Sequence, residues 1–306
     1  MRSFVRDVVH NVVHSVVRNV ARGVLCSSLL VIAFWTTLSA HDTWIVPKQW
    51  VMKPSEPFSM TITSGEAFPK PQHPIEASRI SSVGVRIGTS SFLLLGGTAL
   101  PKATELKGTV GGYGVATAYV VLRPRTITLK PHQVRHYLQE IGASDSLQAA
   151  WNKPSKTMRW RETYAKHAKS LLCVASSPND VGSIVAADTA FSKPIGQVLE
   201  LVPLANPLLL KAGDTLLVKV LFNKQPLVGV SVGAAHEGST KGVLVKTNAE
   251  GVANIVLRKS GVWLVRCTHL RPASESGTDA GNDGESSFES DFATLTFKLP
   301  FKPRGI

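Results

Sequence analysis

The sequence predicts a mainly β protein with two antiparallel β-sandwich units, immunoglobulin-like or transthyretin-like, and a short helical connector. Two observations indicate this fold class. Short runs rich in β-branched and aromatic residues recur along residues 41–130 and again along residues 199–306. Turns rich in Pro and Gly separate these runs at short intervals, which is typical of antiparallel sandwiches rather than of alternating strands and helices.

Residues 41–130 are predicted to form the first sandwich. Turn clusters at residues 53–57 and 68–71 divide its strands. The predicted strands are WIVPKQWVM, FSMTITS, SVGVRIG, SFLLLGG and GVATAYVVLRPR.

Residues 131–198 are predicted to be the helical connector. The runs VRHYLQEIGASDSLQAAW and MRWRETYAKHAKSLL carry apolar residues at helical spacing, which predicts two helices that meet near Asn152. His132 and His136 would share one face of the first helix, at a spacing that suits metal ligation. Neither a carboxylate nor a cysteine partner accompanies them, so solvent-exposed histidines are the favoured interpretation. His167 also falls in this region.

Residues 199–306 are predicted to form a compact immunoglobulin-like sandwich. Its strands include GDTLLVKVLF, LVGVSVGAAHEG, GVANIVLR and GVWLVRCTHL, with a hairpin turn at residues 247–251. Residues 271–287 are a polar, low-complexity stretch that predicts a disordered loop. The run FESDFATLTFKL then predicts the closing strand.

The first 40 residues have the pattern of a secretory signal peptide. A basic stretch precedes an uncharged, mostly apolar run of 15 residues, 24–38, and Ser39-Ala40 supply small residues at the cleavage site. The run is shorter than the roughly 20 residues of a membrane-spanning helix. We therefore expect cleavage after Ala40, a mature chain that begins with His41, a periplasmic or secreted location, and only transient membrane contact. An uncleaved anchor is the alternative.

The net charge of +13 and the pI of 9.8 permit binding to anionic polymers. Four arginines against Asp7 give the first 40 residues a net +3, so the mature chain carries +10. The sequence contains no long run of Lys and Arg, no zinc-finger spacing and no aromatic-basic stripe. A solvated basic surface is the expected interpretation, and no nucleic-acid partner is predicted.

Cys173 and Cys267 are the two cysteines of the mature chain, and each lies in an apolar run. Burial as small hydrophobic residues is the favoured interpretation. A disulfide in an oxidising compartment stays open at this point, because the sequence does not give the geometry.

Two familiar catalytic patterns are missing: no P-loop and no H-E-x-x-H appears. The distinctive chemistry is that of the predicted new amino terminus. A free α-amine has a pKa near 8, and with the ring nitrogen of a terminal histidine it can chelate one metal ion. Nitrogen donors suit nickel, copper and zinc, and Asp42 adds a nearby carboxylate.

Three stretches resemble the exported DUF4198 proteins, which are often described as periplasmic components of nickel or cobalt uptake. The first is Ala40-His41-Asp42-Thr43-Trp44 with Pro47, similar to the family's A-H-D-x-W opening. The second spans residues 161–222, with RETYAKHAKSLL, LELVPLANP and GDTLLVKVLF. The third combines GVWLVRCTHL with FESDFATLTF.

The resemblance implies a β-rich periplasmic protein that passes a transition metal, nickel, cobalt or copper, to or from a membrane transporter. It implies His41, Asp42, His269 and Glu289 as metal ligands, with Glu289 either a ligand or a partner that orients an imidazole. The family's closing stretch has Trp where this chain has Phe288 and Phe292, and an acidic residue where it has Ser287. His236 is a further candidate, although a turn position explains it.

Three function hypotheses follow. The first is a non-catalytic metal-binding protein that is accessory to nickel or cobalt uptake. The second is a carbohydrate- or protein-binding sandwich module of the cell envelope, since such folds carry many unrelated functions. The third is an oxidative enzyme built on a copper-chelating terminal histidine, although the chain is not expected to be an enzyme.

Overall fold

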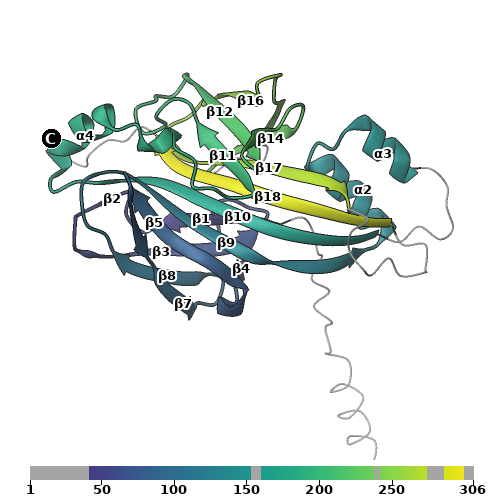
Figure 1. Ribbon diagram of the computed structural model, residues 1–306, viewed down its shortest axis with the longest axis horizontal. Coiled ribbons are helices and arrows are strands. Elements are labelled where there is room, and N and C mark those ends of the chain that lie inside the picture. The colour runs from purple at the N-terminus through teal and green to yellow at the C-terminus, as the bar shows by residue number, and fades with distance from the viewer. Residues whose placement is uncertain (1–40, 153–159, 238, 240–241, 274–285, 300–306) are drawn as a thin grey trace, which may run out of the picture. The chain divides into compact units, whose positions relative to one another are not determined.

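The computed structural model describes residues 41–152, 160–237, 239, 242–273 and 286–299. They form three β-sheets with few helices, as Figure 1 shows, which confirms the predicted fold class. The predicted signal peptide, residues 1–40, lies outside the described residues, and so do residues 274–285 of the predicted polar loop.

The first sheet comes from the predicted first sandwich. Its strands alternate buried and exposed side chains, as a sheet with one covered face requires. In spatial order they are β1 (Asp42–Pro47), β3 (Pro57–Gly65), β8 (Thr104–Thr109) and β7 (Leu95–Ala99), with β4 (His73–Pro74) paired to β3.

The second, central sheet joins strands from both halves of the chain. Most neighbours are antiparallel, but β10 runs parallel to β18 and to the short β2 (Val51–Met52). In spatial order the strands are β15 (Val243–Lys246), β14 (Ser231–His236), β17 (Gly261–Pro272), β18 (Ser286–Leu299), β10 (Trp160–Val174), β9 (Gly114–Leu129), β5 (Ile80–Ile87) and β6 (Ser90–Leu93).

The third sheet covers part of the central sheet from the C-terminal half. All of its pairings are antiparallel. Its strands are β11 (Leu199–Pro203), β12 (Thr215–Phe222) and β13 (Gln225–Pro226), with β16 (Val252–Val256) paired to β12.

The two sandwiches share the central sheet. Leu172 of β10 packs into the core with Ile45 and Ile62 of the first sheet. Its neighbour Leu171 packs into the other core, with Val218 of the third sheet. Because adjacent strand residues point to opposite faces, the first and third sheets cover opposite faces of the central one. The sequence alone predicted two separate units and gave no indication that they share a sheet.

The predicted connector is only partly helical. Its first predicted helix is confirmed as α2 (Pro131–Glu140) and α3 (Asp145–Asn152), which Gly142 separates with a positive φ of 60°. The second predicted helix, in MRWRETYAKHAKSLL, was wrong, because this segment is β10. Every residue from His167 to Val174 is buried, since both faces of β10 are covered. That burial removes the alternating pattern that marks a strand.

The remaining helices are short. They are α4 (Val181–Ala187) and the 3-10 turns η1 (Ala77–Arg79), η2 (Pro178–Asp180) and η3 (Ala190–Ser192). No helix in the described part of the chain has the length and apolar character needed to cross a membrane.

Cys173 and Cys267 are both free and buried in the core under the third sheet. Burial raises the pKa of the Cys173 thiol to about 11 and that of Cys267 to about 12. The prediction that they act as small hydrophobic residues is confirmed, and the alternative of a disulfide between them is not realised.

Candidate metal site at the start of strand β1

The strand register brings His41, Glu66 and His73 to one end of the first sheet. Asp42 of β1 lies opposite Gly65 of β3, so the residues just outside these two strands, His41 and Glu66, are neighbours. His73 of β4 lies opposite Ser64 on the other side of β3. Three residues that are far apart in the sequence therefore meet at the end of β3.

Side-chain hydrogen bonds shape the loop between Glu66 and His73. The side-chain oxygen Oε1 of Gln72 accepts hydrogen bonds from the backbone N–H groups of Glu66 and Ala67. The hydroxyl of Thr63 accepts from the N–H groups of Gln72 and His73, at 3.1 and 3.3 Å. The loop ends are thus held by polar side chains that replace missing backbone partners.

Trp44 anchors the same loop to the central sheet. Its indole is buried and meets the ring of Phe68 edge-on, with centroids 5.6 Å apart. The two rings share a small apolar core with Val262 and Leu264 of β17. This packing accounts for the Trp of the A-H-D-x-W stretch as a structural residue.

The His41 ring contacts both other polar residues at this end of the sheet. Its Nε2 lies 3.3 Å from Oε1 of Glu66, and its ring centroid lies 5.0 Å from that of His73. The His41 side chain is 17% exposed and that of Glu66 is 49% exposed. Burial lowers the pKa of His41 more than the charge of Glu66 raises it, so the neutral imidazole, the form that binds metals, is favoured.

The backbone at the start of β1 is tied to the central sheet. Lys166 of β10 donates from Nζ to the carbonyl oxygen of His41 at 2.6 Å. The hydroxyl of Thr294 on β18 donates to the carbonyl oxygen of Thr43, also at 2.6 Å. Burial lowers the pKa of Lys166 to about 8, although nearby Asp42 opposes this. These contacts fix the position of the backbone at His41 and Thr43.

The Asp42 carboxylate is held by an arginine. Arg266 of β17 donates from Nη1 to Oδ2 of Asp42 at 3.0 Å and to Oε1 of Glu140 at 3.1 Å. Burial raises the pKa of Asp42, and the charge of Arg266 opposes that rise. In this position Asp42 anchors β1 to β17 and α2, so its contacts are those of a structural ion pair.

His269 and Glu289 lie on the opposite face of the central sheet from His41 and Asp42. The register between β17 and β18 is regular along their whole length. Arg266 of β17 and Thr294 of β18 contact the start of β1. His269 lies an odd number of residues from Arg266, and Glu289 an odd number from Thr294. The side chains of His269 and Glu289 therefore point to the opposite face of the sheet. His41 and Asp42 have different side-chain partners, Glu66 and Arg266, and both lie on the other side of the central sheet from His269 and Glu289.

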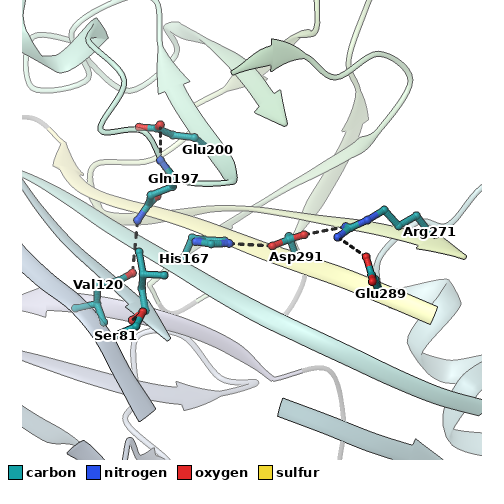
Figure 2. A network of polar contacts seen from close by, with 9 residues as sticks. Ser81, Val120, His167, Gln197, Glu200, Arg271, Glu289 and Asp291 are labelled. Atoms are coloured by element: carbon teal, nitrogen blue, oxygen red, sulfur yellow. Dashed lines mark hydrogen bonds and ion pairs between the residues drawn. The ribbon is translucent and has the colours of Figure 1, made fainter. Parts of the chain in front are cut away.

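A polar network joins His167, Asp291, Arg271 and Glu289 on that opposite face. Figure 2 shows it running from His167 through Asp291 to Arg271 and Glu289. Nε2 of His167 lies 3.0 Å from Asp291 Oδ1, Arg271 donates to Asp291 Oδ2 at 2.8 Å, and it also donates to Glu289 Oε2 at 3.0 Å. The His269 ring packs against Phe222, with centroids 4.5 Å apart.

Electrostatics in this network favour bound carboxylates. Burial alone would raise the pKa of Asp291, but hydrogen bonds from His167 and Arg271 outweigh it and lower the pKa. Burial also lowers the pKa of His269, with the charge of Arg271 acting in the same direction. Arg271 pairs with both Asp291 and Glu289. Glu289 is therefore bound to a guanidinium and is not free to bind a metal ion.

Sequence reasoning missed Glu66 and His73. Neither lies in a motif, and only the β1–β3–β4 register brings them beside His41. The further candidate His236 has its Nε2 2.7 Å from the carbonyl oxygen of Ser260, a structural contact at the end of β14. In the described part of the chain, no three His, Cys, Asp or Glu side chains already surround one metal position.

The donors at the start of β1 would be completed by the amino terminus itself. Two imidazoles, from His41 and His73, lie beside one carboxylate, from Glu66. A free α-amine on His41 would be a third nitrogen donor at this end of the sheet. Imidazole and amine nitrogens fit nickel and copper, so the residues at this end of the sheet fit such an ion.

Comparisons with known proteins place the chain in a family. A family model described as "Domain of unknown function (DUF4198)" matches residues 38–271. No curated protein matches the chain. One solved structure that it is similar to is the full ectodomain (Ig1–Ig3) of mouse nectin-like molecule 4, at 9% identity and a TM-score of 0.18, and the match covers 87% of this chain and 66% of that one. The family model covers most of the chain, and this protein belongs to the DUF4198 family.

Proposed function

We propose that the mature protein, exported and cleaved after Ala40, binds one nickel, cobalt or copper ion as cargo at its amino terminus. The ligands are the α-amine and imidazole of His41 and the imidazole of His73. The observation that carries this proposal is the contact between His41 Nε2 and Glu66, with the His73 ring beside them.

The contact with Glu66 selects which His41 nitrogen faces the ion. Because Nε2 is bonded to the carboxylate, Nδ1 is the ring nitrogen left for the metal. Nδ1 is also the nitrogen close enough to the residue's own α-amine to close a small chelate ring. A carboxylate on the far nitrogen fixes the tautomer and orientation of a metal-bound imidazole and makes it a stronger donor.

The fold supports this site by holding the terminal residue still. Lys166 binds the carbonyl oxygen of His41, and Thr294 binds that of Thr43. A ligand that is already ordered loses less conformational freedom when the ion binds. In the proposed role, accessory to metal uptake, the protein would exchange the ion with a membrane transporter in the cell envelope.

The test is to block the amine and leave the rest of the site intact. Mature protein that begins with His41 and a version with one alanine added before it would be titrated with NiCl2, CoCl2 and CuCl2 by calorimetry. We expect the extension to weaken the tight binding event by at least about a hundredfold, or roughly 2.7 kcal/mol. Equal affinities for both proteins would overturn the proposal. Intact mass of the exported protein would check the cleavage site.

A second candidate function is a peptide- or protein-binding module, which a groove in the first sandwich favours. The groove has a volume of about 620 Å³ and is lined in part by Phe58, Leu93 and Leu95. Leu93 and Leu95 are 72% and 71% exposed, on strands β6 and β7 that each end a sheet. An unpaired strand edge can accept an extended peptide.

Metal titration separates the two candidates. Absence of heat with all three metals, together with peptide-array binding that Leu93→Glu and Leu95→Glu abolish, would favour the module. The converse pattern would favour metal cargo.

A further inference from the structure

Helix α2 presents two histidines to solvent on one face. The helix spans Pro131–Glu140, and its buried side chains are Val134, Tyr137 and Leu138. His132 and His136 are both exposed, as the sequence predicted. Residues four apart on a helix are neighbours, with Cβ atoms roughly 5–6 Å apart.

We propose that His132 and His136 form a second metal-binding site, weaker than the one at the amino terminus. Two imidazoles one helical turn apart can bind one ion together, which is the arrangement that two histidines at this spacing use for zinc in metalloproteases. Nickel, copper and zinc all accept imidazole ligands. Water completes the coordination, so the site binds ions loosely and exchanges them readily.

The helix is a rigid platform for such a pair. Its first turn is closed by Gln133, whose side-chain oxygen accepts a hydrogen bond from the Lys130 N–H at 2.8 Å. Its inner face is fixed by Tyr137, whose ring stacks on Phe292 at 6.3 Å and meets Trp160 edge-on at 6.1 Å. The spacing of the two exposed histidines is therefore set before an ion arrives.

The pair lies on the same side of the central sheet as the start of β1. Glu140, one turn after His136, accepts a hydrogen bond from Arg266, and the same Arg266 atom donates to Asp42, the neighbour of His41. His132 and His136 on α2 thus lie on the same side of the central sheet as His41, the side that α2 and β1 cover. The second site does not depend on the amine, and it stands or falls independently of the proposed terminal site.

The experiment uses mature protein purified without an affinity tag and titrated with NiCl2 and CuCl2. We expect two binding events, the weaker of which disappears in His132→Ala and in His136→Ala. The matched control combines His136→Gln with Gln139→His. It keeps two exposed histidines on the helix but separates them by two turns, about 10 Å, too far to share one ion. This control should also lack the weak event.

The two sites can be told apart in the same assay. An alanine added before His41 should remove the tight event and leave the weak one, whereas the α2 variants should do the reverse. A weak event that persists in His132→Ala, His136→Ala or the spacing control would overturn the α2 site. A single event in the unaltered mature protein that the α2 variants leave unchanged would overturn it as well.

Discussion

Two groups of similar residues lie on opposite sides of the central sheet and have different consequences. On one face His167 and Asp291 are joined by Arg271, which also binds Glu289. On the other, His41 contacts Glu66 and lies beside His73. Histidine and carboxylate occur in both groups. In the first group, however, Arg271 pairs with the two carboxylates, Asp291 and Glu289, that a metal ion would need.

Burial separates the two groups further. The side chains of His167 and Asp291 are 2% and 5% exposed, under the third sheet. His41 and Glu66 remain in contact with solvent at the end of the first sheet. Breaking an enclosed, hydrogen-bonded pair is costly for the fold, whereas an accessible pair can exchange an ion with its surroundings.

The largest expected effect comes from breaking the enclosed network. Asp291→Ala leaves the buried His167 without its hydrogen-bond partner and removes one acceptor of Arg271. We expect the free energy of unfolding to fall by about 3 kcal/mol, as for other broken buried pairs. Urea denaturation of the mature protein measures this. The affinity for metal should not change. A loss of metal affinity at unchanged stability would contradict the view that this network stabilises the fold and that the metal binds on the other side of the sheet.

Glu289→Ala is the matched control for that measurement. Glu289 binds the same Arg271 but is partly exposed. Exposed ion pairs contribute about 0–1 kcal/mol, so the control should lie well below Asp291→Ala.

The next effect concerns the group formed by His41, Glu66 and His73 at the end of the first sheet. His73→Ala removes one imidazole and should weaken nickel or copper binding by at least about tenfold, or 1.4 kcal/mol. His269→Ala is the matched histidine on the other face and should leave the affinity unchanged. Calorimetry on both variants makes the comparison. A larger loss for His269→Ala would restore the ligand set that the family resemblance implies and argue against His73.

A smaller effect should appear on acidification. The pKa of Asp291 is lower in the native protein than the value of about 3.9 in an unfolded chain. Its ionised form therefore contributes stability that is complete above about pH 4 and is lost as the pH falls through the native pKa. Unfolding free energies of the unaltered protein should fall more steeply in this acid range than those of Asp291→Ala. Parallel curves would show that the network does not lower this pKa.

The sequence predicted most of the fold because its strands are short and are separated by turns rich in Pro and Gly. FSMTITS became β3 and GVATAYVVLRPR became part of β9. It failed at β10, where both faces are buried and the apolar residues do not alternate. The parallel pairing of β10 with β18 was also beyond it, because nothing local specifies which distant strand becomes a neighbour.

The candidate site was predicted only in part, for a related reason. His41 was found from the chemistry of a new amino terminus, which needs no partner strand. Glu66 and His73 reach it through the β1–β3–β4 register. The grouping of His41 with His269 ignored the alternation of side chains along β17, which separates them by a whole sheet.

The smallest expected effect tests how Glu66 acts. If its carboxylate orients the His41 ring through Nε2, Glu66→Ala should weaken metal binding by a few-fold to about tenfold. Glu66→Gln keeps an oxygen acceptor at the same position and should retain most of the affinity. Because Glu66 is half exposed, neither variant should alter stability appreciably. If both variants lose affinity equally, the charge of Glu66 matters more than the orientation it gives, and direct ligation by the carboxylate becomes the better account of this face.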